Sequence, residues 1–327
     1  MHLHRRRLLS GAAALTGTLV VGSGASARAA SPSTSAGASD AVSDAFSIDV
    51  ADRFAALERR HGARLGVFGY DVRTGVAVRY RADERFPLCS TFKTLAVAAV
   101  LRDLDRRGEF LARRVRYTQA DIDRSGGAPV TGEKENLKHG MTVAELCAAA
   151  VSYSDNTAAN LLLRALGGPT AVTRFARSTG DRVTRLDRWE PELNSAEPDR
   201  VTDTTTPRAI GTTYARLVLG RVLEPEDRAR LTGWLLGNTT SGERFRAGLP
   251  DDWVLGDKTG TGSYGTANDV GIAWKPGAPP YGHRSSGRGD RTDPVVLSVL
   301  TTKPGEGAAA DSQLVAEAAK LMAGALS

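Results

Sequence analysis

The sequence predicts an α/β (α+β) protein in which an antiparallel sheet, made from both ends of the chain, is flanked by helices and carries a helical insertion. Two observations support this prediction. Short β-rich segments lie near the start and in the last third of the chain, whereas the middle has helical spacing. The 327 residues, 41% hydrophobic and 24% charged, suffice for one large domain or two smaller ones.

The first predicted elements are a helix and a hairpin. Helical spacing over residues 44–61 places four apolar side chains on one face, namely Phe46, Val50, Phe54 and Leu57. Segments 64–71 and 76–80 flank the turn residues Arg73-Thr74-Gly75, which is typical of a β-hairpin.

Helices are predicted for the middle of the chain. An apolar run at residues 94–107 follows Ser90, and a capping box, Thr142 with Glu145, opens a helix through Ser152. Further helices are expected at residues 157–166, 207–219 and 226–236. Strands then return at residues 253–257, 268–274 and 295–302, before a closing helix at 308–326. The Gly- and Pro-rich residues 276–293 are expected to form a surface loop.

The N-terminus has the pattern of an export signal. Arg5-Arg6-Arg7, a mildly apolar stretch at 8–21 and small residues near Ala29 predict a twin-arginine-type signal peptide at residues 1–30, hence a secreted protein. A disordered basic tail is the alternative. The apolar stretch is too short for a membrane span, so no membrane association is expected after its removal. Residues 31–44 are expected to be a flexible linker.

The charge and the cysteines limit the possible partners and bonds. Four of the positive charges behind the formal net charge of +6 lie in residues 1–30, so the remainder carries only +2, which predicts no nucleic-acid partner. Cys89 and Cys147 could form one disulfide, but their sequence neighbourhoods favour two buried free thiols.

Ser90-Thr91-Phe92-Lys93 places a hydroxyl and an amine three positions apart, on one face of a helix. A Ser hydroxyl is a poor nucleophile until a base takes its proton, and a buried Lys can be that base. Taken alone, the pair is more simply a helix cap followed by a surface Lys.

Two further segments have the same ambiguity. Ser154-Asp155-Asn156 supplies a second hydroxyl for proton transfer and an amide for a substrate amide, or merely caps a helix. Lys258-Thr259-Gly260 ends a strand with groups that suit a carboxylate, or is an ordinary strand end.

In this order, the segments resemble those of class A serine β-lactamases, from about Ala45 to Ser327. The resemblance implies a β-lactamase/penicillin-binding-protein-like fold: a five-stranded antiparallel sheet in an α/β subdomain (45–88 and 237–327) and an all-helical subdomain (89–236) with an Ω-loop at 188–203. It implies a monomer that hydrolyses penicillins and cephalosporins without a metal or other cofactor.

The resemblance also implies roles. Ser90 would form the acyl-enzyme with help from Lys93, Ser154 would relay a proton, and Asn156 would bind the acylamide side chain. Lys258, Thr259, Gly260 and Thr261 would hold the substrate carboxylate, and the backbone N–H groups of Ser90 and Thr261 would form the oxyanion hole. Whether Lys93 or a Glu is the acylation base stays open.

Glu190-Pro191-Glu192-Leu193-Asn194 distinguishes a hydrolase from a transpeptidase, because only a hydrolase needs a base beside a water. By resemblance, Glu190 is that base, Asn194 helps to fix the water, and the Glu190–Pro191 bond is cis. Arg188 and Asp203 correspond to the ion pair that closes the Ω-loop; an ordinary surface pair is the alternative.

The chain also departs from the family pattern. Many members use an Arg in the stretch after Lys-Thr-Gly to bind the substrate carboxylate, but residues 264–268 lack one. Arg244 is its expected substitute, and Arg246 is expected to have a structural role. Some carbapenem-hydrolysing relatives bond a Cys before the nucleophile to a second Cys two residues after Lys-Thr-Gly. Here Cys89 matches the first position but Gly262 occupies the second, so no carbapenemase activity is inferred. Residues 122–130 lack the aromatic that commonly lines the cavity rim.

Three other functions are alternatives to a serine hydrolase. A penicillin-binding D,D-peptidase would lack the Glu190 segment, and a β-lactam-binding sensor would need a broken proton relay. A zinc β-lactamase is excluded because His61, His139 and His283, the histidines beyond the signal, have no H-x-H spacing.

Overall fold

The computed structural model describes residues 36–276 and 293–327, with side chains from Asp49 onward. The predicted signal peptide and most of the predicted loop at 276–293 lie outside the described residues. Residues Asp44–Ser327 form one compact unit. Helix α1 (Ala36–His61) begins earlier than predicted, so the expected linker 31–44 is helical from Ala36. Its alanines, which have the highest helix propensity, explain the difference.

One antiparallel sheet of five strands lies at the centre of the compact unit, as predicted. Its order is β2-β1-β9-β8-β7, so the first two strands of the chain pair with the last three. The sheet thus consists of β1 (Arg64–Asp71), β2 (Ala77–Tyr80), β7 (Val254–Gly262), β8 (Thr266–Trp274) and β9 (Pro294–Thr302).

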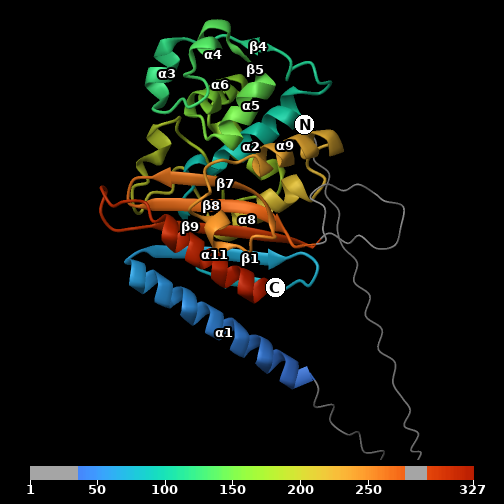
Figure 1. Cartoon of the computed structure of the whole chain (residues 1–327), viewed down its shortest axis with the longest axis vertical. Coiled ribbons are helices and arrows are strands. Elements are labelled where there is room, and N and C mark those ends of the chain that lie inside the picture. Colours follow the sequence, from blue (N-terminus) through green and yellow to red (C-terminus); the bar gives the residue numbers. More distant parts are fainter. Residues whose placement is uncertain (1–35, 277–292) are drawn as a thin grey trace, which may run out of the picture. The chain divides into compact units, whose positions relative to one another are not determined.

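Helices cover both faces of the sheet (Figure 1). Helix α11 (Ser312–Leu326) packs on one face with α10 (Phe245–Gly248) and the later part of α1, around buried residues such as Phe54, Leu297 and Met322. Helix α8 (Pro207–Val218) packs on the other face, where the second and larger core begins. The sheet therefore separates two hydrophobic cores.

The larger core continues into a group of helices around α2 (Phe92–Ala99). All residues of α2 are buried. A π-helical turn at Val100–Leu104 extends this helix, so the predicted helix 94–107 ends three residues early. The elements packed here, shown in green to orange in Figure 1, are α5 (Val143–Ser152), α6 (Asn156–Leu166), α7 (Thr170–Ser178) and α9 (Pro225–Leu236).

Shorter elements complete the chain. They are the strands β3 (Phe86–Pro87), β4 (Arg114–Val115), β5 (Met141–Thr142) and β6 (Thr204–Thr205), the helices α3 (Gln119–Ser125) and α4 (Lys134–His139), and the 3-10 turns η1 (Cys89–Thr91) and η3 (Glu192–Ser195). The predicted capping box is confirmed: Thr142 and Glu145 bond each other's backbone N–H. The closing helix begins at Ser312, four residues later than predicted.

Two further predictions concern single features. Cys89 and Cys147 are both buried and free, which confirms two thiols rather than a disulfide. Among the described helices, none is both long and apolar enough to cross a membrane. The division into an α/β and a helical subdomain stays a prediction.

Candidate active site

Ser90 lies in the turn η1, which leads directly into the buried helix α2. Cys89 before it has a φ of 43°, a left-handed conformation that turns the chain at the start of the helix. Strand β7 approaches this turn closely at Gly260, where an added Cβ would lie 3.3 Å from the backbone N of Ser90 and 3.1 Å from Leu88 O. The absence of a side chain at Gly260 therefore lets the Lys258-Thr259-Gly260 strand lie against the nucleophile.

Lys93 connects Ser90 to the second predicted segment. It follows Ser90 by three residues, and its side chain is fully buried. Its Nζ donates to the backbone O of Ser154 at 2.8 Å and to Oδ1 of Asn156 at 2.6 Å, and it lies 3.4 Å from Ser154 Oγ. The left-handed φ of 57° at Ser154 turns this segment toward Lys93. The fold thus brings together residues more than sixty positions apart.

Glu190 joins the first two segments. Its Oε1 accepts a hydrogen bond from Ser90 Oγ at 3.2 Å and lies 3.0 Å from Lys93 Nζ, while its Oε2 accepts from Asn194 Nδ2 at 2.5 Å. Its peptide bond to Pro191 is cis, as the resemblance implied. One carboxylate therefore contacts the predicted nucleophile, the predicted lysine base and the predicted water-positioning amide.

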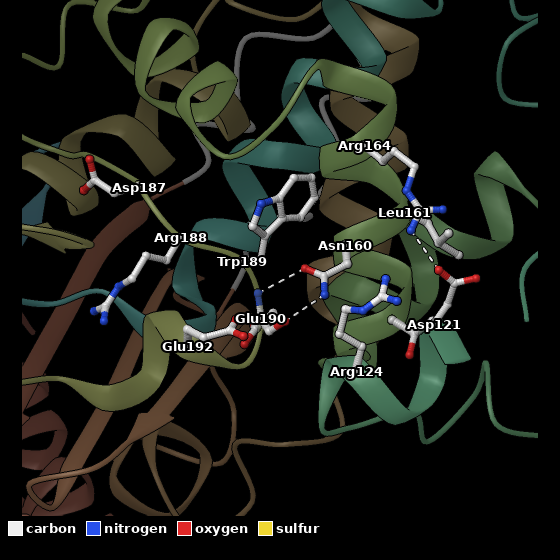
Figure 2. A pocket seen from close by; sticks show the side chains of 11 residues that line it. Asp121, Arg124, Asn160, Leu161, Arg164, Asp187, Arg188, Trp189, Glu190 and Glu192 are labelled. Atoms are coloured by element: carbon white, nitrogen blue, oxygen red, sulfur yellow. Dashed lines mark hydrogen bonds and ion pairs between the residues drawn. The ribbon is translucent and has the colours of Figure 1, made fainter. Parts of the chain in front are cut away.

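Asn160 of helix α6, a residue not predicted from the sequence, holds the backbone of Glu190. Its Nδ2 donates to Glu190 O at 2.8 Å, and its Oδ1 accepts from Glu190 N at 3.0 Å (Figure 2). Asn160 follows Asn156 by four residues and so lies on the same face of α6. The only sign of Asn160 in the sequence is a polar residue on the same helix face as Asn156.

A cavity of about 540 Å³ lies next to this contact (Figure 2). Trp189, Asn160 and Glu190 line it, together with Asp121, Arg124, Thr157, Leu161, Arg164, Asp187, Arg188 and Glu192. Neither Ser90 nor Lys93 is among the lining residues. The cavity is therefore distinct from the place where the predicted motifs meet, although the Glu190 segment borders both.

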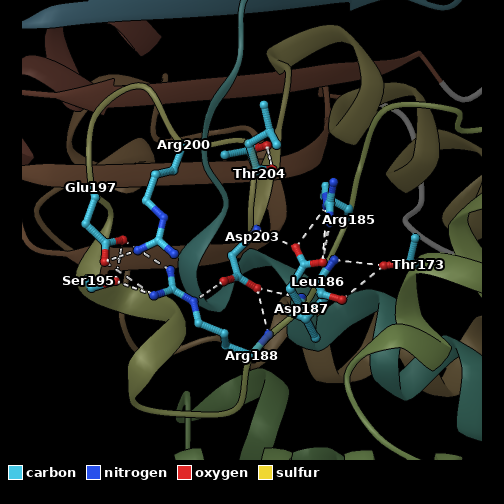
Figure 3. Close-up of polar contacts among 11 residues, drawn as sticks. Thr173, Arg185, Leu186, Asp187, Arg188, Ser195, Glu197, Arg200, Asp203 and Thr204 are labelled. Carbon is cyan, nitrogen blue, oxygen red and sulfur yellow. Dashed lines mark hydrogen bonds and ion pairs between the residues drawn. The ribbon is translucent and has the colours of Figure 1, made fainter.

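The Ω-loop is closed by the predicted ion pair. Arg188 Nε lies 2.6 Å from Asp203 Oδ2, and Asp203 Oδ1 also accepts the backbone N–H groups of Asp187 and Arg188 (Figure 3). Arg188 additionally bonds Ser195 and Glu197 further along the loop. Asp203 is only 1% exposed, so the alternative of an ordinary surface pair is wrong.

Lys258 is fully buried beside the site. Burial, reinforced by the positive charge of Lys93, lowers the pKa of Lys258 to about 7. The neighbouring Thr259 hydroxyl shares a short hydrogen bond with Thr240, another residue that the sequence analysis missed. Lys93 and Lys258 thus lie close enough for their charges to interact where strand β7 meets the nucleophile.

Arg244, rather than Arg246, lies at the end of this strand. Its guanidinium donates to Gly260 O and Asn268 O at 2.8 Å each and to Thr261 Oγ1 at 2.7 Å. Desolvation lowers the pKa of Arg244, which is only 7% exposed. Arg246 points instead to Leu236, Leu255 and Asp257, in keeping with a structural role.

The comparisons with known proteins agree with this geometry. Residues 49–283 match the beta-lactamase enzyme family. The chain is 65% identical over 277 residues to a beta-lactamase of Streptomyces fradiae, covering 85% of this chain and 86% of that one. A beta-lactamase of Streptomyces albus G is 59% identical over 324 residues, 98% and 96% of the two chains. A solved structure from Streptomyces albus G superposes with a TM-score of 0.80 at 63% identity, covering 85% of this chain and all of that one.

The chain therefore belongs to the β-lactamase enzyme family, as a class A serine β-lactamase.

Proposed function

We propose that this β-lactamase hydrolyses penicillins and cephalosporins through an acyl-enzyme on Ser90, which water activated by Glu190 then removes. The observation that carries the proposal is the position of Glu190 Oε1, 3.2 Å from Ser90 Oγ and 3.0 Å from Lys93 Nζ. A base within hydrogen-bond reach of a hydroxyl is the arrangement that activates a serine nucleophile.

In the acylation step, Ser90 Oγ forms a bond to the lactam carbonyl carbon while its proton passes to a base. The Ser90 hydroxyl donates to Glu190, which supports Glu190 as the acceptor, while Lys93 contacts the same oxygen and keeps the alternative route open. The backbone N–H groups of Ser90 and Thr261 stabilise the oxyanion. The close approach of Gly260 to Ser90 N supports this pairing of turn and strand.

The lactam C–N bond then breaks, and the nitrogen must receive a proton. Ser154 delivers it, because its hydroxyl lies 3.4 Å from Lys93 Nζ and so borders the same proton path. The proton that leaves Ser90 can therefore reach the lactam nitrogen through groups already in contact.

Deacylation requires a water beside a base. Glu190 takes a proton from the water as the water oxygen attacks the ester carbonyl, and it returns that proton to Ser90 Oγ as the ester bond breaks. Asn194 holds Glu190 through its Nδ2, and its Oδ1 is buried without a hydrogen-bond partner in the described part of the chain. That oxygen is an acceptor suited to the water. A base that can activate a water, as Glu190 does here, favours a hydrolase over a D,D-peptidase.

The substrate carboxylate binds Lys258, Thr259, Thr261 and Arg244. Arg244 already bonds Thr261 Oγ1, which supports it as the substitute for the Arg missing at residues 264–268. Asn156 binds the acylamide side chain. Beside it, a Cβ added to Gly127 would lie 3.1 Å from Asn156 Nδ2, so the rim is formed here by glycine.

Turnover of a chromogenic cephalosporin by the purified protein tests the activity, and Glu190→Ala tests the mechanism. The variant should accumulate a covalent adduct on Ser90, detected by intact mass, with deacylation slowed by at least about 100-fold. Ser90→Ala is the matched control and should give no adduct. Rapid turnover by Glu190→Ala without an adduct would remove Glu190 from deacylation.

We also propose that the enzyme is a secreted monomer, exported by the twin-arginine route. The support is the Arg5-Arg6-Arg7 segment with its apolar stretch and small residues. Replacing Arg6 and Arg7 by Lys should retain the precursor inside the cell, whereas export of the double variant at the normal rate would exclude the route. Sedimentation of the purified protein tests the monomer.

A further inference from the structure

Two carboxyl side chains lie together beneath the Lys258-Thr259-Gly260 strand. Asp257 on β7 and Asp269 on β8 are both 0% exposed. Thr259 pairs with Asp269 across the two strands, so Asp257, two residues before Thr259, lies on the same face as Asp269 and diagonal to it. Lys258, which follows Asp257 in the strand, lies on the opposite face. These residues, the carboxyl pair, have no part in the mechanism above.

Each member of the pair is bonded through one oxygen only. Asp257 Oδ2 accepts from Asn238 Nδ2 at 2.8 Å, and Asp269 Oδ2 accepts from the backbone N of Phe245 at 3.2 Å. Both Oδ1 atoms are buried and have no hydrogen-bond partner among the described residues. A hydrogen bond between these two neighbouring side chains requires a proton, because an ionised carboxylate has no donor.

We propose that Asp257 and Asp269 share a single proton and act as positioning residues for the groups that bind the substrate carboxylate. Two ionised carboxylates in contact and out of water repel each other, whereas one shared proton supplies the missing donor and leaves one negative charge. Burial, and for Asp269 also the charge of Asp257, raises both pKa values, Asp269 well above its ordinary range.

The pair is connected to two residues of the carboxylate site. Asp269 holds Phe245 N, the residue directly after Arg244. Asp257 holds Asn238, whose Oδ1 accepts from Thr240, and the Thr240 hydroxyl bonds Thr259. In both cases the pair acts through another residue, so it positions Arg244 and Thr259 rather than touching the substrate.

The single negative charge also matters for Lys258. Both acids oppose the lowering of the Lys258 pKa. Around the pair lie Arg246 of α10, at 3.6 Å from Asp257 Oδ1, Asn238 and Ser241 of the preceding loop, and Arg244, whereas Lys258 and Tyr214 of α8 lie on the opposite face of the sheet. Complete removal of the charge would leave Lys258 less protonated at neutral pH, and a second charge would force the two strands apart.

Infrared spectroscopy of the full enzyme at neutral pH tests the shared proton directly. The wild type should show a protonated-carboxyl C=O band that shifts in D₂O, and both Asp257→Asn and Asp269→Asn should lose it. Asp181→Asn is the matched control, because Asp181 is also buried but accepts from four N–H and O–H donors, and it should keep the band. A band that survives in Asp257→Asn and Asp269→Asn would overturn the shared proton.

The kinetic part of the inference rests on the proposed function. Each single Asn variant keeps one charge and should change the KM of a penicillin by no more than about threefold, whereas the double variant should raise KM about tenfold at pH 7.5, the effect of lowering the Lys258 pKa by one unit. Equal KM values in single and double variants would overturn the positioning role. Because the infrared measurement uses no substrate, a failure of the proposed mechanism would leave the band unaffected.

Discussion

Asp203→Asn tests how the Ω-loop holds Glu190 in place. Asp203 is 1% exposed and accepts three hydrogen bonds, from Arg188 Nε at 2.6 Å and from two backbone N–H groups at 2.6 and 3.0 Å. The Asn carbonyl can still accept the backbone bonds, but its NH₂ group faces the Arg188 guanidinium, donor against donor. The substitution therefore removes one charge-assisted bond and leaves the others.

The size of the effect follows from the burial of the partners. A charge-assisted hydrogen bond contributes about 1.5–3 kcal/mol, and the side chain of Arg188, 25% exposed, loses part of its attraction to solvent screening. We expect the free energy of unfolding to fall by about 2 kcal/mol. For a compact unit of this size that lowers Tm by about 3–4 °C. Deacylation should slow as well, because Glu190 and Asn194 both lie on the loop.

The assay combines thermal unfolding with the fraction of acylated enzyme during turnover. The matched control is Arg200→Ala, which removes an ion pair of Glu197 at 2.8 Å in which Arg200 is 51% exposed. This exposed pair should contribute no more than about 0.5 kcal/mol. If Asp203→Asn and Arg200→Ala have the same Tm, or if Asp203→Asn accumulates no acyl-enzyme, the Ω-loop does not depend on Asp203 as argued.

Three further predictions follow from the site. Arg244→Ala should raise the KM of a penicillin about 10-fold or more, because a charge-assisted bond is lost. The control Arg246→Ala should leave KM near the wild-type value, and equal KM values in the two variants would contradict the role of Arg244. Asn160→Ala removes two bonds to the Glu190 backbone and should slow deacylation by roughly 10- to 30-fold, measured as a larger acylation burst. KM should rise with pH above about 7, because Lys258 has a pKa of about 7 and is charged only below it; a flat KM between pH 6 and 9 would exclude this.

Local patterns predicted the elements well, because their causes are local. The alternating strands, the Thr142 capping box and the apolar helices all depend on neighbours within a few residues. The end of the predicted helix at 94–107 was wrong for a different reason. Asp105 accepts the backbone N–H groups of Phe110 and Leu111, and this contact with the following turn ends the helix at Leu104.

The site residues that the sequence did not reveal act through distant partners. Asn160 is thirty residues from Glu190, and Asp257 meets Asp269 only because β7 and β8 pair. A lone Asn in a helix, or an Asp in a strand, gives no sign of such a partner. The four motifs could be found because they match a known set. Their supporting residues could be found only from the fold.

The arrangement of these supports separates two abilities of the site. Ser90 and Lys93 are fixed by the buried helix α2, whereas Glu190 depends on Asn160 for its backbone and on Arg188 and Asp203 for the loop that carries it. Weakening Asn160 or Asp203 should therefore slow the release of the product more than acylation, for which Lys93 remains an alternative base. Under the proposed mechanism, such variants would hold the acyl group on Ser90 for longer before releasing it.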